Sequence, residues 1–291
     1  MGELANEARI KARLVTDFEP GISTVRFTGR FPRYGARHMY SVYESDFVCG
    51  RFALTTNEAE LVEEFSITGV SSSRDPLPAN WNIKPTEEIY IIRHGESESN
   101  SRELTHVSWG LIAPWSKSES DAVKSQSQAI NARSESIHEK PTFKRAFSRS
   151  RCLIPATGYY EWATELGRYK TKQPVFISRD DSRNLAFAGI YDRWISPQGV
   201  VRESAAIITR EAVEPLATVH HRMPLFLPQS TWSDWLSPDI TDVHDVRSLM
   251  NVEKPADHLR FWPVRELVNS IRNNGPELIE KIELGEPETL F

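Results

Sequence analysis

The chain is a succession of short apolar runs separated by polar turns, and this pattern predicts many strands and few long helices. The strand-like runs are rich in branched and aromatic residues, and Gly, Pro, Ser or Asp separates them. They cover residues 49–54, 87–94, 107–115, 150–162, 174–179, 185–194 and 203–210. Because strands and helices do not alternate regularly, the pattern favours an α+β fold around a mostly antiparallel sheet or barrel.

Short helices are predicted between these strands. Residues 57–65 have helical spacing and carry acidic residues toward the start, where the helix dipole favours negative charge. The other predicted helices cover residues 140–149, 229–236, 241–250 and 264–272. The Ser-rich stretch 116–127 is predicted to be an exposed loop.

Three segments are expected along the chain. Residues 1–47 show no sustained helical or alternating pattern and are interpreted as an N-terminal extension without an assigned fold. Residues 48–275 are expected to form one β-rich domain, which is long enough to bury a core. Residues 276–291 are acidic and are expected to form a surface tail.

Charge and hydropathy limit the classes of protein that fit. The formal net charge of −5 and the pI near 6.0 give no overall basic signature, so nucleic-acid binding would require a local cluster of Arg and Lys. The chain lacks the apolar run of a signal peptide and the roughly 18 to 20 apolar residues that span a bilayer. We therefore expect a soluble cytoplasmic protein, with a monomer as the default state.

The chain has two cysteines, Cys49 and Cys152, which excludes a disulfide scaffold and a zinc site built from paired CxxC elements. Cys152 lies inside the predicted strand 150–162, a context typical of a core residue. Cys49 opens its strand and precedes Gly50 and Arg51, a small residue and a cation that leave the sulfur accessible and favour the thiolate. Cys49 is therefore the candidate nucleophile, although composition alone equally allows a buried structural cysteine.

Six motifs occur in the order found in the SRAP (SOS response-associated peptidase) family of abasic site processing proteins, and together they resemble that family over roughly residues 49–265. The motifs are Cys49-Gly50-Arg51-Phe52, Trp81-Asn82-Ile83-Lys84-Pro85, Trp109-Gly110-Leu111-Ile112, Ile130-Asn131-Ala132-Arg133-Ser134-Glu135, Gly158-Tyr159-Tyr160-Glu161-Trp162 and His220-His221-Arg222-Met223-Pro224. Any one of them alone is weak, but their common order makes chance agreement improbable.

The resemblance implies a single β-rich α+β domain and a function in DNA damage. Members of the family use an N-terminal Cys to form a thiazolidine with the ring-opened sugar aldehyde of an abasic site in single-stranded DNA. A thiol or an amine alone adds reversibly to an aldehyde, whereas a 1,2-aminothiol closes both atoms onto one carbon in a stable ring. An α-amine has a reference pKa of about 8, so a useful fraction is unprotonated at neutral pH.

The resemblance also assigns catalytic roles beside Cys49. Glu161 would be the acid/base that moves protons as the imine forms and water leaves. Asn131 would hydrogen-bond the deoxyribose. His220 would transfer protons at the sugar end and assist reversal of the crosslink, and the adjacent His221 leaves the choice between the two histidines open.

DNA contacts follow from the same resemblance. Arg51 and Arg133 would clamp phosphates beside the lesion. Further residues would shape the pocket and stack or wedge against the exposed bases, namely Asn82, Pro85, Trp109 and Pro114. Core packing is an equal alternative for the tryptophans, and Trp115 and Trp162 are assigned to the core. The expected partner is single-stranded DNA containing abasic sites, on nucleoid DNA, with no metal or nucleotide cofactor.

Cys49 cannot form a thiazolidine while its nitrogen is in a peptide bond. A bacterial GTG start codon, translated as Val when an upstream start is chosen, would explain Val48 and would make Cys49 the mature N-terminus once the initiating Met is removed. Self-cleavage between Val48 and Cys49, assisted by Glu161 and His220, is the other route.

Three other functions stay open. Residues 91–97, Ile-Ile-Arg-His-Gly-Glu-Ser, resemble the RHGE signature of histidine phosphatases, in which the His accepts a phosphoryl group. That signature belongs on the first strand of an alternating α/β chain, whereas here the pattern predicts a hairpin. The remaining alternatives are a non-catalytic single-strand binder and a thiol peptidase that acts only on its own leader.

Overall fold

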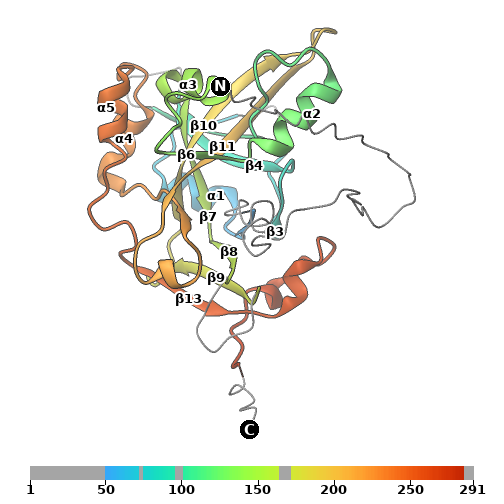
Figure 1. Ribbon diagram of the computed structural model, residues 1–291, viewed down its shortest axis with the longest axis vertical. Coiled ribbons are helices and arrows are strands. Elements are labelled where there is room, and N and C mark those ends of the chain that lie inside the picture. Colours follow the sequence, from blue (N-terminus) through green and yellow to red (C-terminus); the bar gives the residue numbers. More distant parts are fainter. Residues whose placement is uncertain (1–49, 72–74, 96–100, 164–171, 285–291) are drawn as a thin grey trace, which may run out of the picture. The chain divides into compact units, whose positions relative to one another are not determined.

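Two sheets form the core of the computed structural model, which describes residues 50–71, 75–95, 101–163 and 172–284 (Figure 1). The smaller sheet has five strands in the order β13–β9–β8–β1–β3, and every neighbouring pair is antiparallel. The larger sheet has eight strands in the order β12–β11–β10–β7–β4–β5–β2, with β6 paired to β11.

The elements have the following bounds. The strands are β1 (Arg51–Leu54), β2 (Gly69–Val70), β3 (Asn80–Ile83), β4 (Glu88–His94), β5 (Arg102–Trp109), β6 (Asn131–Arg133), β7 (Arg151–Ala156), β8 (Gly158–Trp162), β9 (Pro174–Arg179), β10 (Leu185–Ile195), β11 (Val201–Glu211), β12 (Arg222–Pro224) and β13 (Leu259–Pro263). The α-helices are α1 (Glu58–Glu64), α2 (Glu119–Gln128), α3 (Pro141–Arg149), α4 (Trp232–Leu236) and α5 (Val243–Ser248), and the 3₁₀ helices are η1 (Leu216–Thr218), η2 (Gln229–Thr231), η3 (Glu266–Asn269) and η4 (Pro276–Leu278).

A parallel pairing closes part of the larger sheet into a barrel. Ser204 and Ala205 of β11 pair with Ser108 and Trp109 of β5, so that β11, β10, β7, β4 and β5 form a closed ring of five strands. The remaining pairs within this ring are antiparallel. The predicted α+β fold with a mostly antiparallel sheet or barrel is therefore confirmed.

Two boundaries differ from the sequence prediction near Gly110. The predicted strand 107–115 ends at Trp109, because Gly110 has a φ of +111°, which is outside the range of a strand. A Cβ at this position would also come within 2.3 Å of the Gln126 carbonyl oxygen, so the site requires glycine. The prediction of an exposed loop at residues 116–127 is wrong, because most of this stretch belongs to α2. Ser118 caps this helix by accepting a hydrogen bond from the Asp121 amide, and Gln126 is buried.

The C-terminal segment differs as well. The predicted helix 264–272 contains only the short η3, and the predicted acidic tail is packed in its first residues. Leu278 is fully buried, Trp262 donates from Nε1 to the Ile279 carbonyl at 2.9 Å, and Ile282 pairs with Pro263. Residues 1–49, which include the predicted extension, lie outside the described residues. None of the described helices is both long and apolar enough to cross a membrane.

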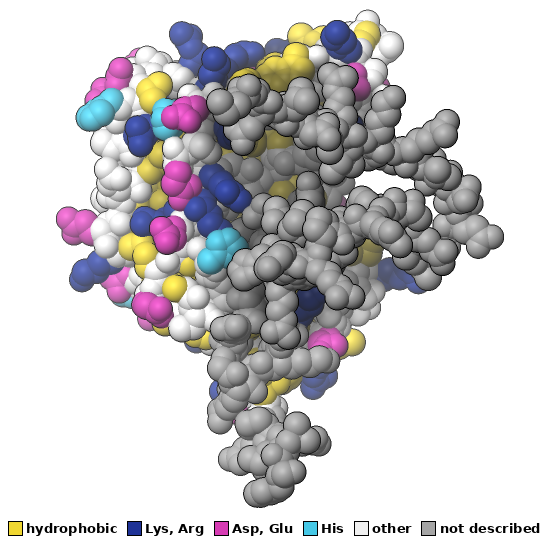
Figure 2. Space-filling model, in the orientation of Figure 1, with side chains coloured by type: hydrophobic (Ala, Val, Ile, Leu, Met, Phe, Trp, Pro, Cys, Tyr) yellow, Lys and Arg dark blue, Asp and Glu magenta, His cyan; other side chains and the backbone are white. Residues whose placement is uncertain are grey.

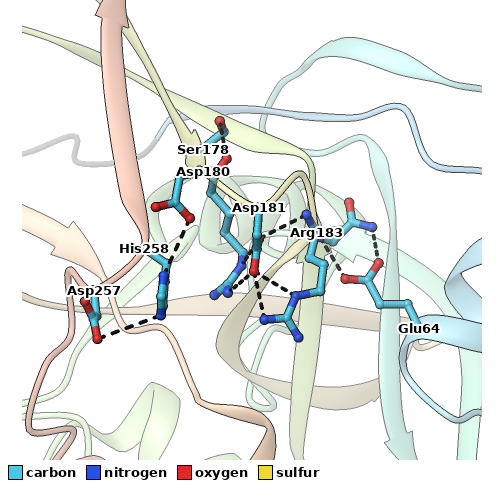
Figure 3. A network of polar contacts seen from close by, with 9 residues as sticks. Glu64, Ser178, Asp180, Asp181, Arg183, Asp257 and His258 are labelled. Carbon is cyan, nitrogen blue, oxygen red and sulfur yellow. Dashed lines mark hydrogen bonds and ion pairs between the residues drawn. The ribbon is translucent and has the colours of Figure 1, made fainter.

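A surface network joins the β9–β10 turn to the loop before β13 (Figure 3). Asp181 accepts hydrogen bonds from the guanidinium groups of Arg179 and Arg183, and the bond from Arg179 holds the pKa of this carboxyl below its usual range. His258 lies between Asp180 and Asp257, at 3.6 and 3.9 Å. These exposed contacts keep the turn in place and contribute little each to stability.

Arg151 holds the helices that cover β7 and β10. Figure 1 shows α3, α4 and α5 gathered beside these strands. The Arg151 guanidinium is buried and donates only to backbone carbonyls, namely those of Phe147, Ser148, Trp235, Ser237 and Ile240. Burial lowers its pKa to about 10, so the group is still charged at neutral pH. One side chain thus satisfies carbonyls at the ends of α3 and α4 that have no helical partner.

We expect Arg151→Met to reduce the free energy of unfolding by about 3 kcal/mol or more, because it leaves several buried carbonyls without donors. Urea unfolding followed by circular dichroism measures the change. Arg149→Met, at an exposed position on α3, is the matched control and should stay within about 0.5 kcal/mol of the parent. An equal effect of the two substitutions would refute the assigned role of Arg151.

Candidate functional site

The pairing of β1 with β8 places the start of one strand beside the end of the other. Arg51 lies opposite Tyr160 and Ala53 lies opposite Gly158 in an antiparallel register. A side chain at Gly158 would come within 2.3 Å of the Phe176 ring, so this close packing requires glycine. Cys49 lies outside the described residues, and Gly50, which follows it in the chain, is the first residue described before β1.

The two faces of the small sheet contact different cores. Phe52 and Tyr159 belong to the main apolar core, whereas Ala53 and Tyr160 belong to a second, smaller cluster. Because side chains alternate along a strand, Glu161 lies on the face of Tyr159. Its side chain is buried, with 4% of the residue exposed. Glu161 is therefore a carboxyl group held inside the protein at the end of β8.

Asn82, for which a DNA contact was predicted, is bonded within the protein. It is buried, its Oδ1 accepts from Arg51 at 2.7 Å, and its Nδ2 donates to the carbonyls of Ser270 and Asn273. Arg51 also donates to the Val268 carbonyl, and its guanidinium lies 5.9 Å from the Trp162 ring centre. Burial lowers the pKa of Arg51. This arginine, predicted to be a phosphate clamp, is thus anchored within the protein through one of its terminal nitrogens.

Trp109 is also inside the core, so the prediction that it stacks on bases is wrong. Its ring is fully buried and contacts the edge of Phe52 at 5.1 Å between ring centres. Its Nε1 donates to the Ile130 carbonyl at 3.0 Å. Trp109 therefore connects β1 to the strand that begins at Asn131. Half-buried Pro85 lies in a turn whose next residue, Thr86, donates to the Trp109 carbonyl.

Asn131 and Arg133 lie on β6, which runs parallel to β11. Their partners in the register are Ile207 and Thr209. Asn131 is half-buried and Arg133 is exposed. The short strand β12 pairs with the same stretch of β11, with Thr209 opposite Pro224. The Asn131 strand and the segment that follows His220 are thus held on one strand.

An ion pair joins these two segments, and sequence reasoning assigned neither partner a role. Arg222 donates to both carboxylate oxygens of Glu135, at 2.6 and 3.0 Å, and to the Thr209 carbonyl. This contact with Arg222 lowers the pKa of Glu135, against the opposing effect of burial. Both residues belong to the quoted motifs, so their position in those motifs was the available signal.

His220 is buried and oriented, whereas His221 is exposed. The two rings lie 4.3 Å apart, and the Arg222 amide donates to His220 Nδ1 at 3.1 Å. Burial, with the charges of His221 and Arg222, lowers the pKa of His220. The lowered pKa favours the neutral imidazole, and the bond that Nδ1 accepts favours the tautomer with its proton on Nε2.

Exposed groups flank α2. Pro114, for which a DNA contact was predicted, is exposed. Trp115 is 55% exposed, so its assignment to the core is wrong. Trp115 and Phe143 line a cavity of about 500 Å³ together with Lys117 and Lys124. Trp162 is half-buried, and its Nε1 donates to the Asn269 side chain. On the face in Figure 2, Lys and Arg are interspersed with Asp and Glu, so the described surface there has no single sign of charge.

Neither Cys152 as a nucleophile nor a histidine phosphatase fits the structure. Cys152 is fully buried and burial strongly raises the pKa of its thiol, so it is a core residue as predicted. The described part of the RHGE segment lies at the end of β4, which pairs with β5 in an antiparallel register, whereas residues 96–100 lie outside the described residues. Arg93 is bound to Glu103 and Glu203, at 2.9 and 3.1 Å, and is not free for a phosphoryl group. This arrangement differs from the alternating α/β context of a histidine phosphatase.

Comparison with known proteins identifies close relatives. Abasic site processing protein YoqW of Bacillus subtilis (strain 168) is 38% identical over 234 residues, which cover 80% of this chain and 99% of YoqW. Abasic site processing protein HMCES of Gallus gallus is 35% identical over 214 residues, 66% of this chain and 62% of that protein.

Solved structures share the fold. A protein from Bacteroides thetaiotaomicron superposes with a TM-score of 0.67 at 26% identity, covering 81% of this chain and 100% of the other. A protein from Bordetella bronchiseptica superposes with a TM-score of 0.62 at 29% identity, covering 75% of this chain and 100% of the other. Residues 48–271 match the SRAP family, described as SOS response associated peptidase. The chain therefore belongs to the SRAP family.

Proposed function

We propose that this protein processes abasic sites in single-stranded DNA by capturing them covalently on Cys49, once Cys49 is the N-terminal residue. Membership of the SRAP family and the names of the relatives support the substrate. The observation that carries the mechanism is the antiparallel pairing of β1 with β8, since the strand that starts two residues after Cys49 runs beside the strand that ends with Glu161 and Trp162.

The proposed reaction is a condensation that balances without an oxidant or a metal. The α-amine of Cys49 adds to the aldehyde carbon of the ring-opened sugar, and loss of water gives an imine. The thiol then adds to the same carbon, its proton passes to the nitrogen, and a thiazolidine results. One C–N and one C–S bond replace the C=O bond, and one water leaves.

Glu161 suits proton transfer in this reaction. Its carboxyl group is buried at the end of β8, where water access is limited and a proton can be given to the leaving hydroxyl. Asn131 is the proposed hydrogen-bond partner of the sugar. The link from Phe52 through Trp109 to the Ile130 carbonyl supports this role, because it fixes β6 relative to β1.

His220 is the preferred histidine for proton transfer at the sugar end. It is held by the Arg222 amide, whereas His221 is exposed to solvent. With its proton on Nε2, the neutral imidazole can donate a hydrogen bond to a sugar oxygen, and it can release that proton once a second proton is taken up at Nδ1. Exposed Arg133 and Pro114 remain the proposed contacts to the DNA, together with Pro85.

Exposure of the amine is a separate step. Translation from the codon of Val48, or cleavage between Val48 and Cys49, would supply the free aminothiol. The second route would make this chain a thiol peptidase toward its own leader, with Glu161 and His220 assisting. A single-strand binder without covalent chemistry is the competing proposal, and the next experiment separates it from capture.

We expect protein that begins at Cys49 to form a crosslink with abasic single-stranded DNA that survives denaturing electrophoresis, in EDTA and without nucleotide. Cys49→Ala should abolish the band, because alanine has no sulfur atom to close the thiazolidine ring. Intact DNA of the same sequence is the substrate control. A band that persists in Cys49→Ala would sink the proposal.

The full 291-residue chain, verified by intact mass, is the matched protein control. It should bind the same DNA yet form no crosslink, because its Cys49 nitrogen is in a peptide bond. Comparable crosslinking by the verified full chain would show that the thiol or a lysine suffices. The intact mass of protein from the native host tells which start is used.

The pH profile tests the role of His220. The ratio of crosslinking rates of the parent and His220→Gln cancels the titration of the α-amine, and we expect it to be about 100-fold. Since the pKa of His220 is lowered, the neutral form persists as pH falls past about 6.5, the ordinary value. The ratio should therefore stay constant down to that pH and decrease only below it.

His221→Gln provides the control for this profile. Removing His221 removes one of the charges that lower the pKa of His220, so the decrease should move toward higher pH while the rate at pH 8 stays near that of the parent. A ratio of parent to His220→Gln rates that already declines above pH 6.5 would contradict the assignment of His220.

A further inference from the structure

The loop of residues 265–274, here called the C-terminal loop, touches the two strand ends of the proposed site. Arg51, at the start of β1, donates from its guanidinium to the Val268 carbonyl at 3.0 Å. Trp162, at the end of β8, donates from Nε1 to Asn269 Oδ1 at 2.7 Å. The loop therefore borders the edge of the sheet from which the chain leads back to Cys49.

Hydrogen bonds from β3 and within the loop hold the C-terminal loop in place. Buried Asn82 donates to two of its carbonyls, those of Ser270 and Asn273. The Trp81 amide donates to Asn274 Oδ1 at 2.8 Å, and Asn273 Nδ2 donates to the Leu267 carbonyl within the loop. Its polar backbone groups are thus used internally, and its conformation is set before any ligand binds.

The outward side of this loop is apolar and cationic. Ile271 is 58% exposed and Leu267 is 43% exposed, although apolar side chains of this size usually pack inside. Arg272 is exposed and forms no ion pair with any described residue. An apolar surface beside a free guanidinium suits a flexible strand whose bases are unstacked and whose phosphates are negative.

The position of the loop fits the same occupant. Glu161 faces the main core on one side of the small sheet, whereas Arg51 and Trp162 face the loop on the other. A strand whose abasic sugar reaches the start of β1 would pass this edge, where the C-terminal loop lies. Positive charge at Arg272 complements the backbone of that strand.

We propose that the C-terminal loop is a DNA-binding wall, in which Ile271 and Leu267 contact a base or sugar beside the abasic nucleotide and Arg272 binds a phosphate. This proposal rests on the proposed function. Asn82 and Arg51 then act as positioning residues, which set the loop without touching DNA.

Binding can be tested without the covalent step. The probe is a single-stranded oligonucleotide that carries a tetrahydrofuran abasic analogue, which has no aldehyde and cannot crosslink. With the full 291-residue chain, we expect Ile271→Ala to weaken binding about fivefold, the equivalent of roughly 1 kcal/mol of lost apolar contact. Arg272→Gln should lower the slope of log K against log salt by about 0.7, the value for one phosphate of a single strand.

Matched controls come from the β10 strand. Ile195 is also 58% exposed, and Arg193 is likewise exposed, so Ile195→Ala and Arg193→Gln make the same chemical changes elsewhere. Both controls should bind like the parent. Parent-like binding and salt slope in Ile271→Ala and Arg272→Gln would overturn the wall, even if crosslinking at Cys49 is confirmed. If protein that begins at Cys49 formed no crosslink while the loop variants still weakened binding as expected, the covalent chemistry alone would be overturned.

Discussion

The antiparallel register between β1 and β8 is the constraint on which the proposed site depends. With Arg51 opposite Tyr160, the beginning of one strand and the end of the other share one edge. If β1 slipped by one residue against β8, its side chains would exchange faces. Phe52 would then leave the main core, and Arg51 would lose its bonds to Asn82 and the C-terminal loop. Tight packing at Gly158, where no side chain fits, helps to exclude that shift.

The strands could be predicted because burial on defined faces leaves a visible pattern of branched and aromatic residues. The helix α2 could not, since its sequence is mostly serine and charge, and its stability comes from a cap at Ser118 and a small buried face. Site residues in motifs were found as groups, but not their individual roles. Whether Trp109 faces a base or a Phe52 ring depends on tertiary packing that the local sequence does not encode.

Asn82, Arg151 and Arg222 share one physical role. Each donates from a buried or half-buried side chain to backbone carbonyls of segments distant in sequence. Such a bond contributes about 1 kcal/mol net, yet a carbonyl left without it loses about 1–3 kcal/mol. Of the three, Asn82 was predicted from the sequence to contact DNA, because surface binding residues have the same chemistry. In the structure Asn82 fixes the C-terminal loop, Arg151 fixes the ends of α3 and α4, and Arg222 fixes β12 on β11.

A mixed surface charge is compatible with the proposed capture of DNA. The chain has a net charge of −5, and cations on the visible face are interspersed with carboxylates, so long-range attraction to DNA is weak. Covalent capture does not require tight reversible binding, because ring closure holds the product after each productive encounter. The reversible step must only orient the sugar aldehyde against the aminothiol. A short preorganised wall and a few phosphate contacts are sufficient for that, and they leave undamaged strands free to dissociate.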